Sequence, residues 1–588
     1  MSVAQRSRVL LLAAGALTLG GTWLGAHPSA RLTSQVTRPA PPVSASAFHI
    51  EPAGVTPTDA DGLIPNPKTP TGRAPGDVSR CNRTADSARG ATSASVNALI
   101  KSKENSITSR YVICLTGTFT SPIHVWSKWS AALLVIEAEP GKTAHLALGE
   151  VKPSDPNPND HDGGDTGGVD ITDTRDVEVE GLDISGYWAD GPDYAPTGIL
   201  VTVRQSTQTN QAKTPHESVC YLKGDRTCSD IYLIDDKISG IANRADEVSD
   251  VRKDCNDGDV GAFGIAVLSY GNDEAHALQH VVIEGDTVDH TRTGQSETVT
   301  VNGDVQDFLE ADDRVYDTDN IGMDAIGWEE GTDQAREGLI TGNTVANVDT
   351  YGNHSYGRWV DDSCANLAEN AAGIYDDGAS YIWISDNTVY NTDQGIDADV
   401  ETPKRATDHI LVSDNKVFDG PGTSLRSPSI GSNPPGVPGK STDAGHAFDA
   451  FYVDSYGAGS MIEDVYAYGN RFSNESQFYG ASKAQDAPVV DIAGRYGDIM
   501  LWDNTILGYG AADKLNPLFE IDNQPVKSAP DVFDCTDYGR LSTASSGAGN
   551  FDDPGDTYLG LPAWQAHNGH GYDAHSTLGS TSCEAAVA

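Results

Sequence analysis

The chain repeats one short pattern nine times between residues 176 and 508, and this repeat constrains the fold more than any other feature. Each copy has a hydrophobic strand, a polar turn and a second hydrophobic strand, as in DIYLIDDKISG from Asp230 and YIWISDNTVYN from Tyr381. Eight copies place Asp or Asn at one turn position: Asp236, Asp286, Asp313, Asn343, Asn387, Asn415, Asn470 and Asn504. Such residues tolerate the left-handed backbone of a tight bend, and they can hydrogen-bond to one another when coils stack. Short strands with fixed turn chemistry and no amphipathic helix between them predict a β-solenoid.

The repeat occupies only part of the 588 residues. Residues 1–26, with Arg6 and Arg8 before an apolar run, are typical of a secretory signal peptide, so we expect an extracellular protein. Residues 27–80 are rich in Pro, Thr and Ala and predict a flexible leader. We expect the solenoid over 81–510, with a capping helix in ATSASVNALIKSK, and a C-terminal cap or tail over 511–588.

The eight cysteines point to disulfide bonds. An even number in an exported chain favours disulfides, and the sequence has no CxxC motif of the kind that binds zinc or exchanges thiols. Sequence alone does not fix the pairing. Joining neighbours along the chain gives four pairs: Cys81 with Cys114, Cys220 with Cys228, Cys535 with Cys583 and, from the remainder, Cys255 with Cys364.

The charge balance limits the partners. There are 39 Lys and Arg against 85 Asp and Glu, a net charge of −46. Such a surface repels nucleic acids and anionic membranes and favours a soluble monomer. It also disfavours a polyanionic substrate unless cations or a local basic patch intervene. Most of the acidic residues are spread through the predicted turns, where they are solvated. Only acidic residues clustered at special strand positions are therefore taken as candidate catalytic residues.

A second strand register places acidic residues in a row. Aligning copies such as AGIYDDG (Ala372) and QGIDADVE (Gln394) puts one residue of each coil in the row: Leu200, Ala266, Asp324, Tyr375, Asp397 and Asp449. Residues two positions along face the same way because side chains alternate across a strand, and these are Ile326, Asp377 and Asp399, with Glu401 beyond. Stacked carboxylates repel one another, which raises a pKa and creates a proton donor. The row therefore predicts a catalytic or cation-binding cluster, with solvated acids on a wet face as the alternative.

The cap-plus-coil pattern over residues 90–510 resembles secreted right-handed parallel β-helix proteins of the pectin-lyase-like superfamily. The resemblance implies an all-β, single-stranded right-handed parallel β-helix and a carbohydrate substrate. GIYDDG and GIDADVE further resemble the acid strands of β-helix glycoside hydrolases of the β-xylosidase type. That resemblance implies Asp377 as the nucleophile and Asp397, or else Glu401, as the proton donor. This chain differs in having Asp376 directly before Asp377, and it shows no inserted sandwich domain.

The carboxylate spacing allows either stereochemical course of hydrolysis. Asp377 and Asp399 are expected in register at ~5 Å, whereas Asp377 and Asp397 are expected roughly 8 Å apart, and these values match retaining and inverting enzymes respectively. The predicted catalytic residues are Asp377, Asp397, Asp324 and Glu401. The predicted substrate-binding residues are Trp328, Glu329, Tyr375, Asp399 and Asp449.

Two other functions stay open at this point. A Ca²⁺-dependent polysaccharide lyase would use Lys404 and Arg405, which follow Glu401, and the acidic run DPNPNDHDGGD from Asp155 is a candidate Ca²⁺ site that lacks EF-hand spacing. A non-enzymatic cell-wall or glycan-binding solenoid is the other. No resident cofactor is expected, with Ca²⁺ left open, and the expected partner is a polysaccharide or oligosaccharide.

Overall fold

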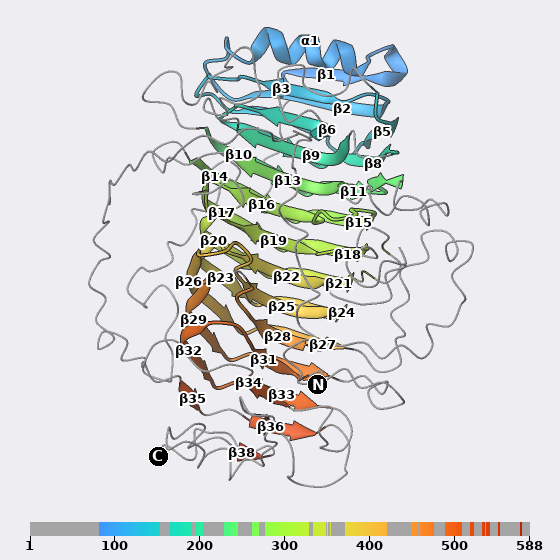
Figure 1. Cartoon of the computed structure of the whole chain (residues 1–588). Helices are drawn as coiled ribbons and strands as arrows, with labels where there is room; N and C mark the ends of the chain where they lie inside the picture. Colours follow the sequence, from blue (N-terminus) through green and yellow to red (C-terminus); the bar gives the residue numbers. More distant parts are fainter. Residues whose placement is uncertain are drawn as a thin grey trace, which may run out of the picture.

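The computed structural model of the chain is a right-handed parallel β-helix, as the sequence predicts (Figure 1). It describes residues 81–152, 165–190, 194–203, 228–244, 261–269, 277–328, 333–348, 350, 353, 371–419, 449–456, 459–474, 488–508, 518–521, 532–534, 537–540, 551–552 and 577–578. The expected signal peptide and leader lie outside these residues. Among the described residues no helix is both long and apolar enough to cross a membrane.

Each coil contributes one strand to each of three parallel sheets, A, B and C, in that order along the chain. The strands of sheet A are β1 (Arg83–Asp86), β2 (Tyr111–Phe119), β4 (Leu134–Ala138), β7 (Val177–Glu180), β10 (Ser229–Ile234), β14 (Leu278–Glu284), β17 (Val305–Ala311), β20 (Arg336–Thr341), β23 (Ser380–Ser385), β26 (Ala406–Ser413), β29 (Met461–Tyr468), β32 (Tyr496–Trp502) and β35 (Val532–Asp534).

Sheet B begins with the second half of β2, which bends from one sheet into the next. Its other strands are β5 (Ala144–Glu150), β8 (Asp183–Ala189), β11 (Lys237–Ser239), β12 (Ala242–Asn243), β15 (Thr287–Thr291), β18 (Arg314–Thr318), β21 (Thr344–Val348), β24 (Thr388–Thr392), β27 (Lys416–Asp419), β30 (Arg471–Asn474), β33 (Thr505–Gly508), β36 (Asp537–Arg540) and β38 (Thr577–Leu578).

Sheet C carries the candidate site. Its strands are β3 (Ile123–Trp126), β6 (Asp165–Thr172), β9 (Ala195–Val203), β13 (Phe263–Ser269), β16 (Val299–Gly303), β19 (Met323–Ile326), β22 (Ala372–Asp377), β25 (Gln394–Asp399), β28 (Asp449–Val453), β31 (Val490–Ile492), β34 (Phe519–Ile521) and β37 (Phe551–Asp552). Strands β34 to β38 continue the same three sheets by parallel pairing. The expected end of the solenoid at residue 510 is therefore too early.

The helix expected at the N-terminal end forms and covers the first coil. Helix α1 (Ser93–Lys103), preceded by the short helix η3 (Ser87–Arg89), starts with Thr92 as its N-cap. The Thr92 side chain accepts a hydrogen bond from the Ser95 N–H, and the Ser95 hydroxyl accepts one from the Thr92 N–H, which satisfies two free donors of the first turn. Val96 and Ile100 are fully buried from this helix. Because they cover the open end of the core, the first strands are protected from pairing with other chains.

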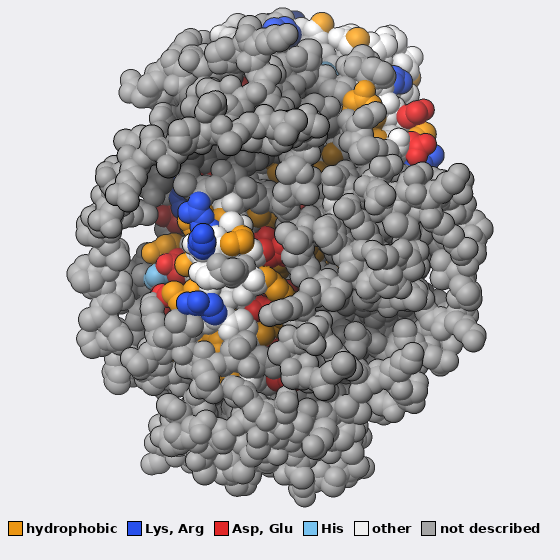
Figure 2. Space-filling model, viewed as in Figure 1, with side chains coloured by type: hydrophobic (Ala, Val, Ile, Leu, Met, Phe, Trp, Pro, Cys, Tyr) orange, Lys and Arg blue, Asp and Glu red, His pale blue; other side chains and the backbone are white. Residues whose placement is uncertain are grey.

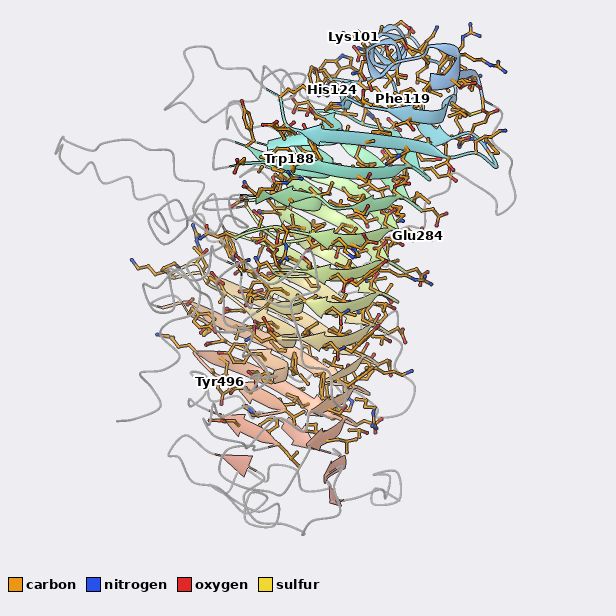
Figure 3. All side chains as sticks on the ribbon, turned by 90° about the vertical axis from the view of Figure 1, so that its right-hand side faces the viewer. Lys101, Phe119, His124, Trp188, Glu284 and Tyr496 are labelled. Atoms are coloured by element: carbon orange, nitrogen blue, oxygen red, sulfur yellow. A yellow bond between two sulfur atoms is a disulfide. The ribbon has the colours of Figure 1, made fainter. Side chains whose placement is uncertain are left out.

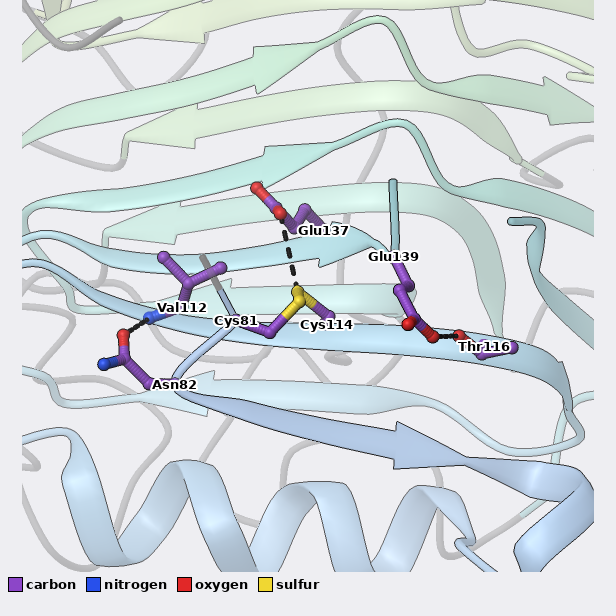
Figure 4. The surroundings of a disulfide bond; sticks show 7 residues. All are labelled: Cys81, Asn82, Val112, Cys114, Thr116, Glu137 and Glu139. Carbon is purple, nitrogen blue, oxygen red and sulfur yellow. Dashed lines mark hydrogen bonds between the residues drawn. A yellow bond between two sulfur atoms is a disulfide. The ribbon is translucent and has the colours of Figure 1, made fainter. Parts of the chain in front are cut away.

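A disulfide fixes the same end of the solenoid. Cys81 and Cys114 are bonded, as pairing of chain neighbours predicts, with Cα atoms 5.5 Å apart and Glu137 beside them (Figure 4). Cys228 is also disulfide-bonded. Each of the other three expected pairs includes a cysteine outside the described residues. The confirmed bond joins the chain just before β1 to the adjacent strand β2.

The turn between sheets A and B is held by the predicted ladder of polar side chains. The backbone N–H of each ladder residue donates to Oδ1 of the ladder residue in the next coil, for example Asn343 N–H to Asn387 at 2.9 Å and Asn415 N–H to Asn470 at 3.0 Å. The left-handed residue is the one before it, such as Asp235 with φ 54° and Asp386 with φ 55°. The expectation that one residue does both jobs is therefore wrong: its neighbour makes the bend, and the ladder residue makes the bonds.

The interior is a continuous apolar core of inward-facing side chains from all three sheets. Figure 3 shows the coils stacked from the side, with Phe119 near the capped end and Tyr496 nearer the other end, and both side chains are buried. Aromatic side chains from different sheets also meet in this core, as Phe451 of β28 in sheet C and Phe472 of β30 in sheet B do with ring centres 5.3 Å apart. Since the core and the backbone ladders stabilise the fold, the outward rows of each sheet are left free to vary.

Candidate functional site

The outer side of sheet C carries the predicted row of side chains, with two changes. Strand pairing runs from Leu200 through Ala266, Asp324 and Tyr375 to Asp397 as expected, and Thr300 of β16 supplies an additional coil between Ala266 and Asp324. Leu200 and Ala266 lie in a small apolar cluster on this outer face. The row therefore changes from apolar to acidic at the middle of the solenoid.

The expectation that Asp449 continues this row is wrong. Asp397 pairs with Tyr452, whereas Asp449 pairs with Gln394. The inward residue Phe451, which pairs with Ile396 and is fully buried, sets this register by filling the core. Aligning the two strands by their acids instead of their core residues displaces the register by three positions.

The corrected register brings further groups to the site that the sequence reasoning missed. Tyr452 takes the place expected of Asp449, and Asp454 follows two residues later, just as Asp399 follows Asp397. Both side chains are buried, with exposed fractions of 6% and 5%. A match of YVD at 452–454 to DAD at 397–399, anchored on the inward residues Val453 and Ala398, is the signal that finds them.

These residues form one buried acidic cluster. We define it as five carboxyl groups and three phenols: Asp377, Asp397, Asp399, Glu401, Asp454, Tyr375, Tyr452 and Tyr456. Asp377 and Asp399 are in register on adjacent coils, as predicted. The side chains of Asp377, Asp397 and Asp399 are at most 3% exposed. Figure 2, drawn from the direction of Figure 1, shows acidic, basic and hydrophobic side chains side by side near the middle of the molecule.

The carboxyl groups of the cluster differ in the hydrogen bonds that they accept. The Tyr375 hydroxyl lies 2.7 Å from Glu401 Oε1 and 3.3 Å from Asp399 Oδ2, where it can donate its proton to either carboxylate. Asp399 Oδ1 accepts from the Val400 N–H, and Asp377 Oδ1 accepts from the Glu401 N–H at 3.2 Å. Asp397 Oδ1, by contrast, is buried without a hydrogen-bond partner in the described part of the chain. Asp397 is thus the cluster acid with the least help toward ionisation.

The pKa shifts in the cluster also indicate that Asp397 tends to keep its proton. Burial raises the pKa of Asp397 well above its usual range, and the neighbouring carboxylates of Asp454, Glu401 and Asp377 raise it further. The pKa of Asp377 is also raised, chiefly by burial and then by Glu401, but the Glu401 N–H opposes this shift. Burial raises the pKa of the Tyr375 phenol as well, so its hydroxyl stays a donor. The cluster holds protons at pH values where free carboxylic acids have lost them.

Asp376, the residue that distinguishes this chain in the motif, has a different position. It faces the interior, in register with Ala325 and Ala398. Its Oδ1 accepts from the Ala379 N–H at 2.9 Å, which holds the turn after β22. Asp376 is therefore a turn residue within the core, on the opposite side of the strand from the cluster.

Trp328 lies at the edge of the cluster. It follows β19 with φ 73°, which is strained for a bulky side chain, and its indole N–H donates to the Ala406 carbonyl at 3.2 Å. Its ring lies against Gly378, where an added Cβ would meet Trp328 Cδ1 at 2.9 Å. The Arg405 guanidinium lies 4.9 Å from the ring centre. Gly378 directly follows Asp377, so the Trp328 ring lies beside the end of β22.

Some of the remaining predicted residues lie on the strands of sheet C, and others lie outside the described residues. Asp324 is fully buried on β19 and pairs with Tyr375. Ile326 is fully buried as well. Glu329 lies outside the described residues, as does almost all of the acidic run from Asp155. Lys404 is exposed in the segment that leads to Arg405.

Within the described residues, three potential metal ligands come within 4.8 Å of one another in two places, both near the capped end. One group contains the disulfide sulfurs of Cys81 and Cys114 with Glu137, and the other contains Glu137, Glu178 and Glu180. The acidic cluster on sheet C is not among them.

Comparison with known proteins gives no family for the chain. No family model matches it. It is 33% identical over 143 residues to YwoF of Bacillus subtilis (strain 168), described as an uncharacterized protein, and this match covers 24% of the chain and 29% of YwoF.

Similar solved structures are distant. They include a GH136 lacto-N-biosidase from Eubacterium ramulus (12% identity, 78% of this chain and 64% of that one, TM-score 0.36) and the Dettilon tailspike protein (10%, 74% and 62%, 0.35). A hyperthermoactive exopolygalacturonase from Thermotoga maritima is similar at 9% identity over 79% of this chain and 88% of that one, with a TM-score of 0.33. The chain spans just under two thirds of the first two of these proteins.

Proposed function

We propose that the protein is an exported carbohydrate-active enzyme, a glycoside hydrolase whose reacting groups lie in the acidic cluster. One observation carries the proposal: two buried carboxyl groups on adjacent coils differ in the hydrogen bonds that they accept. Asp397 Oδ1 is buried with no hydrogen-bond partner among the described residues, whereas Asp377 Oδ1 accepts a backbone N–H. A buried acid without donors keeps its proton, and a carboxylate with an N–H partner ionises more readily. Glycoside hydrolysis needs one carboxyl group in each state.

The proposed mechanism assigns one role to each acid. Asp397 protonates the glycosidic oxygen as the bond to the anomeric carbon breaks. The two residues are one strand spacing and two positions apart, about 8 Å between their Cα atoms. Because both side chains point outward from sheet C, we expect a similar separation of roughly 8 Å between their carboxyl groups, which lies in the range of inverting enzymes. Asp377 then acts as the base that takes a proton from the attacking water, rather than as the nucleophile that the motif resemblance implies.

The surrounding residues support this assignment. The Tyr375 hydroxyl lies within hydrogen-bond distance of both Glu401 and Asp399 and can donate to one of them at a time, which positions these acids beside the reacting pair. The Trp328 ring at the edge of the cluster offers the kind of face on which a sugar ring packs. Its backbone strain is consistent with a functional position, because such strain persists only where the surroundings enforce it.

The test is product analysis on a panel of neutral and acidic glycans with matched variants. Asp377→Asn and Asp397→Asn keep the size of the side chain and remove its acid–base chemistry, so each should lower turnover by at least ~10²-fold. Asp190→Asn, at an exposed position directly after β8, is the control and should retain full turnover.

Two outcomes would replace the proposal with a specific alternative. An unsaturated uronate product that absorbs in the ultraviolet, formed at normal rates by both variants, would identify a lyase. The reaction would then belong to the segment with Lys404 and Arg405, where the Arg405 guanidinium lies over the Trp328 ring. Glycan binding that survives Asp377→Asn, with no product from any substrate, would identify a non-enzymatic glycan-binding solenoid.

A further inference from the structure

The ladder between sheets A and B is built from two kinds of side chain, and they differ in one proton donor. Where the ladder residue is Asn, its amide also donates to a backbone carbonyl of the preceding coil. Asn387 Nδ2 donates to the Ile340 carbonyl, Asn415 Nδ2 to Ile384 and Asn470 Nδ2 to Val412, each at 2.9 Å. In every case the acceptor lies three residues before the preceding ladder residue. The Asn side chain thus bonds through both ends of its amide.

Three coils place Asp at the same position. Their Oδ1 atoms accept the usual ladder bonds: Leu182 N–H to Asp236 at 2.7 Å, Asp236 N–H to Asp286 at 2.6 Å and Asp286 N–H to Asp313 at 2.7 Å. The second oxygen, Oδ2, of each Asp is buried with no hydrogen-bond partner among the described residues. Because the turn repeats, this oxygen occupies the place of the Asn NH₂ group and faces a backbone carbonyl. An ionised Asp would there set two acceptors against each other, whereas a protonated Asp would donate as Asn does.

The surroundings of the three acids contain further acids. Asp235, Glu284 and Asp312 act on them from the outer side, and each of these raises a ladder pKa. Glu310 of β17 acts from inside the solenoid, where it pairs with the core positions Ile283 and Ile340. Both Glu310 oxygens are buried without hydrogen-bond partners in the described structure, and burial raises its pKa to about 8.

Burial is the largest cause of the raised pKa at all three ladder positions. Neighbouring coils lie ~4.8 Å apart, so three ionised carboxylates would repel one another through an apolar interior. The described residues of this ladder do not form one of the groups with three metal ligands in close range. Protonation removes this repulsion and supplies the missing donor in the same step.

We propose that Asp236, Asp286 and Asp313 are neutral carboxylic acids in the folded protein, each donating its proton to a backbone carbonyl of the preceding coil. These coils then form a pH-sensitive segment in an otherwise pH-insensitive ladder. The segment is tight in acid and loosens as pH rises. Its third coil, with Asp313, ends in β19, which carries Asp324 and begins the acidic part of sheet C. The proposal is independent of the reaction at the acidic cluster.

The sign of the pH dependence follows from the direction of the shifts. A carboxyl group with a higher pKa in the folded than in the unfolded state stabilises the fold fully below its unfolded pKa, and that contribution is lost as pH rises through the folded pKa. Replacement by Asn supplies the donor at every pH. Asp286→Asn should therefore raise the melting temperature at about pH 8, by roughly 2 °C or more, and change it little at about pH 4.

The reciprocal variant and a local readout complete the test. Asn415→Asp, which places an acid in the Asn part of the ladder, should cost more stability at about pH 8 than at about pH 4. Hydrogen exchange at the Asp236 amide, which donates to Asp286, should slow in Asp286→Asn at the higher pH after correction for intrinsic exchange. Exposed Asp190→Asn should change none of these values.

Equal effects at both pH values would overturn the proposal. So would a lower melting temperature of Asp286→Asn at about pH 8, because an ionised Asp286 with its own partner would then be the stabilising form. Carboxyl carbon chemical shifts that titrate with an ordinary pKa for all three ladder acids would overturn it directly.

Discussion

Replacing Tyr375 with phenylalanine removes a single oxygen atom from the centre of the acidic cluster. The ring keeps its packing against Ile321 and Ala372, with which it forms a small buried cluster. The hydroxyl is lost as a partner of Glu401 at 2.7 Å and of Asp399 at 3.3 Å. The variant therefore changes the acids and leaves the shape of the site intact.

The size of the effect follows from the kind of hydrogen bond. A bond to a charged acceptor contributes about 1.5–3 kcal/mol, and each ~1.4 kcal/mol is tenfold in rate. If the cluster acts in the transition state, kcat/KM should fall about 10- to 100-fold. Loss of the donor also favours the protonated form of Glu401, whose charge raises the pKa of Asp377. The acidic limb of the pH profile, which reports the Asp377 base, should therefore move to lower pH.

The assay is kcat/KM against pH for the wild type and Tyr375→Phe, on any glycan that the wild type cleaves. Tyr316→Phe is the matched control, because the Tyr316 hydroxyl donates to Asp289 at 2.8 Å on sheet B, away from the cluster. It loses the same kind of bond and should leave the profile unchanged. A Tyr375→Phe profile that superimposes on the wild type would refute the reasoning, since the hydroxyl would then be structural only.

Two further predictions concern stability. Asp376→Asn keeps the bond to the Ala379 N–H and removes a buried acid whose pKa is raised by burial, so it should stabilise the protein above the usual Asp range while turnover stays within about twofold; a loss of activity as large as that of Asp377→Asn would place Asp376 in the reaction. Replacing Cys81 and Cys114 together with Ala should cost about 2–4 kcal/mol. Hydrogen exchange should locate that loss at the capped end, and uniform destabilisation along the solenoid would contradict this account of the disulfide.

The sequence predicts the solenoid well because its signals are local and repeated. The ladder positions from Asp236 to Asn504 depend only on spacing within one coil, and all eight form the expected bonds. The sequence did not show which turn residue adopts the left-handed backbone and which one forms the ladder bonds, because both Asp and Gly adopt the bend at the preceding position. The bond between Cys81 and Cys114 could also be predicted, because these cysteines are close in sequence and belong to neighbouring coils.

The site is harder to predict because it depends on register between coils separated by long insertions. Asp377 and Asp397 are 20 residues apart, and the periodicity places them correctly. Between β25 and β28 the insertion is longer, and the matching of acid to acid chose Asp449 instead of Tyr452. Packing decides such a register, because Phe451 fills a core position that Asp449 does not. Anchoring each strand on its inward residues is the better rule for chains of this kind.

The separation of inward and outward rows explains how one chain can hold so many acids. Inward rows of sheet C are apolar in nearly every coil, and each coil is bonded to the next through backbone groups that do not depend on side chains. An outward row can therefore change from Leu200 and Ala266 to Asp324 and Asp397 without altering the scaffold. Protonation reduces the repulsion between neighbouring carboxyl groups, both in the acidic cluster and in the ladder. The stability of the fold and the reaction at the site therefore both depend on the pH at which buried acids lose their protons.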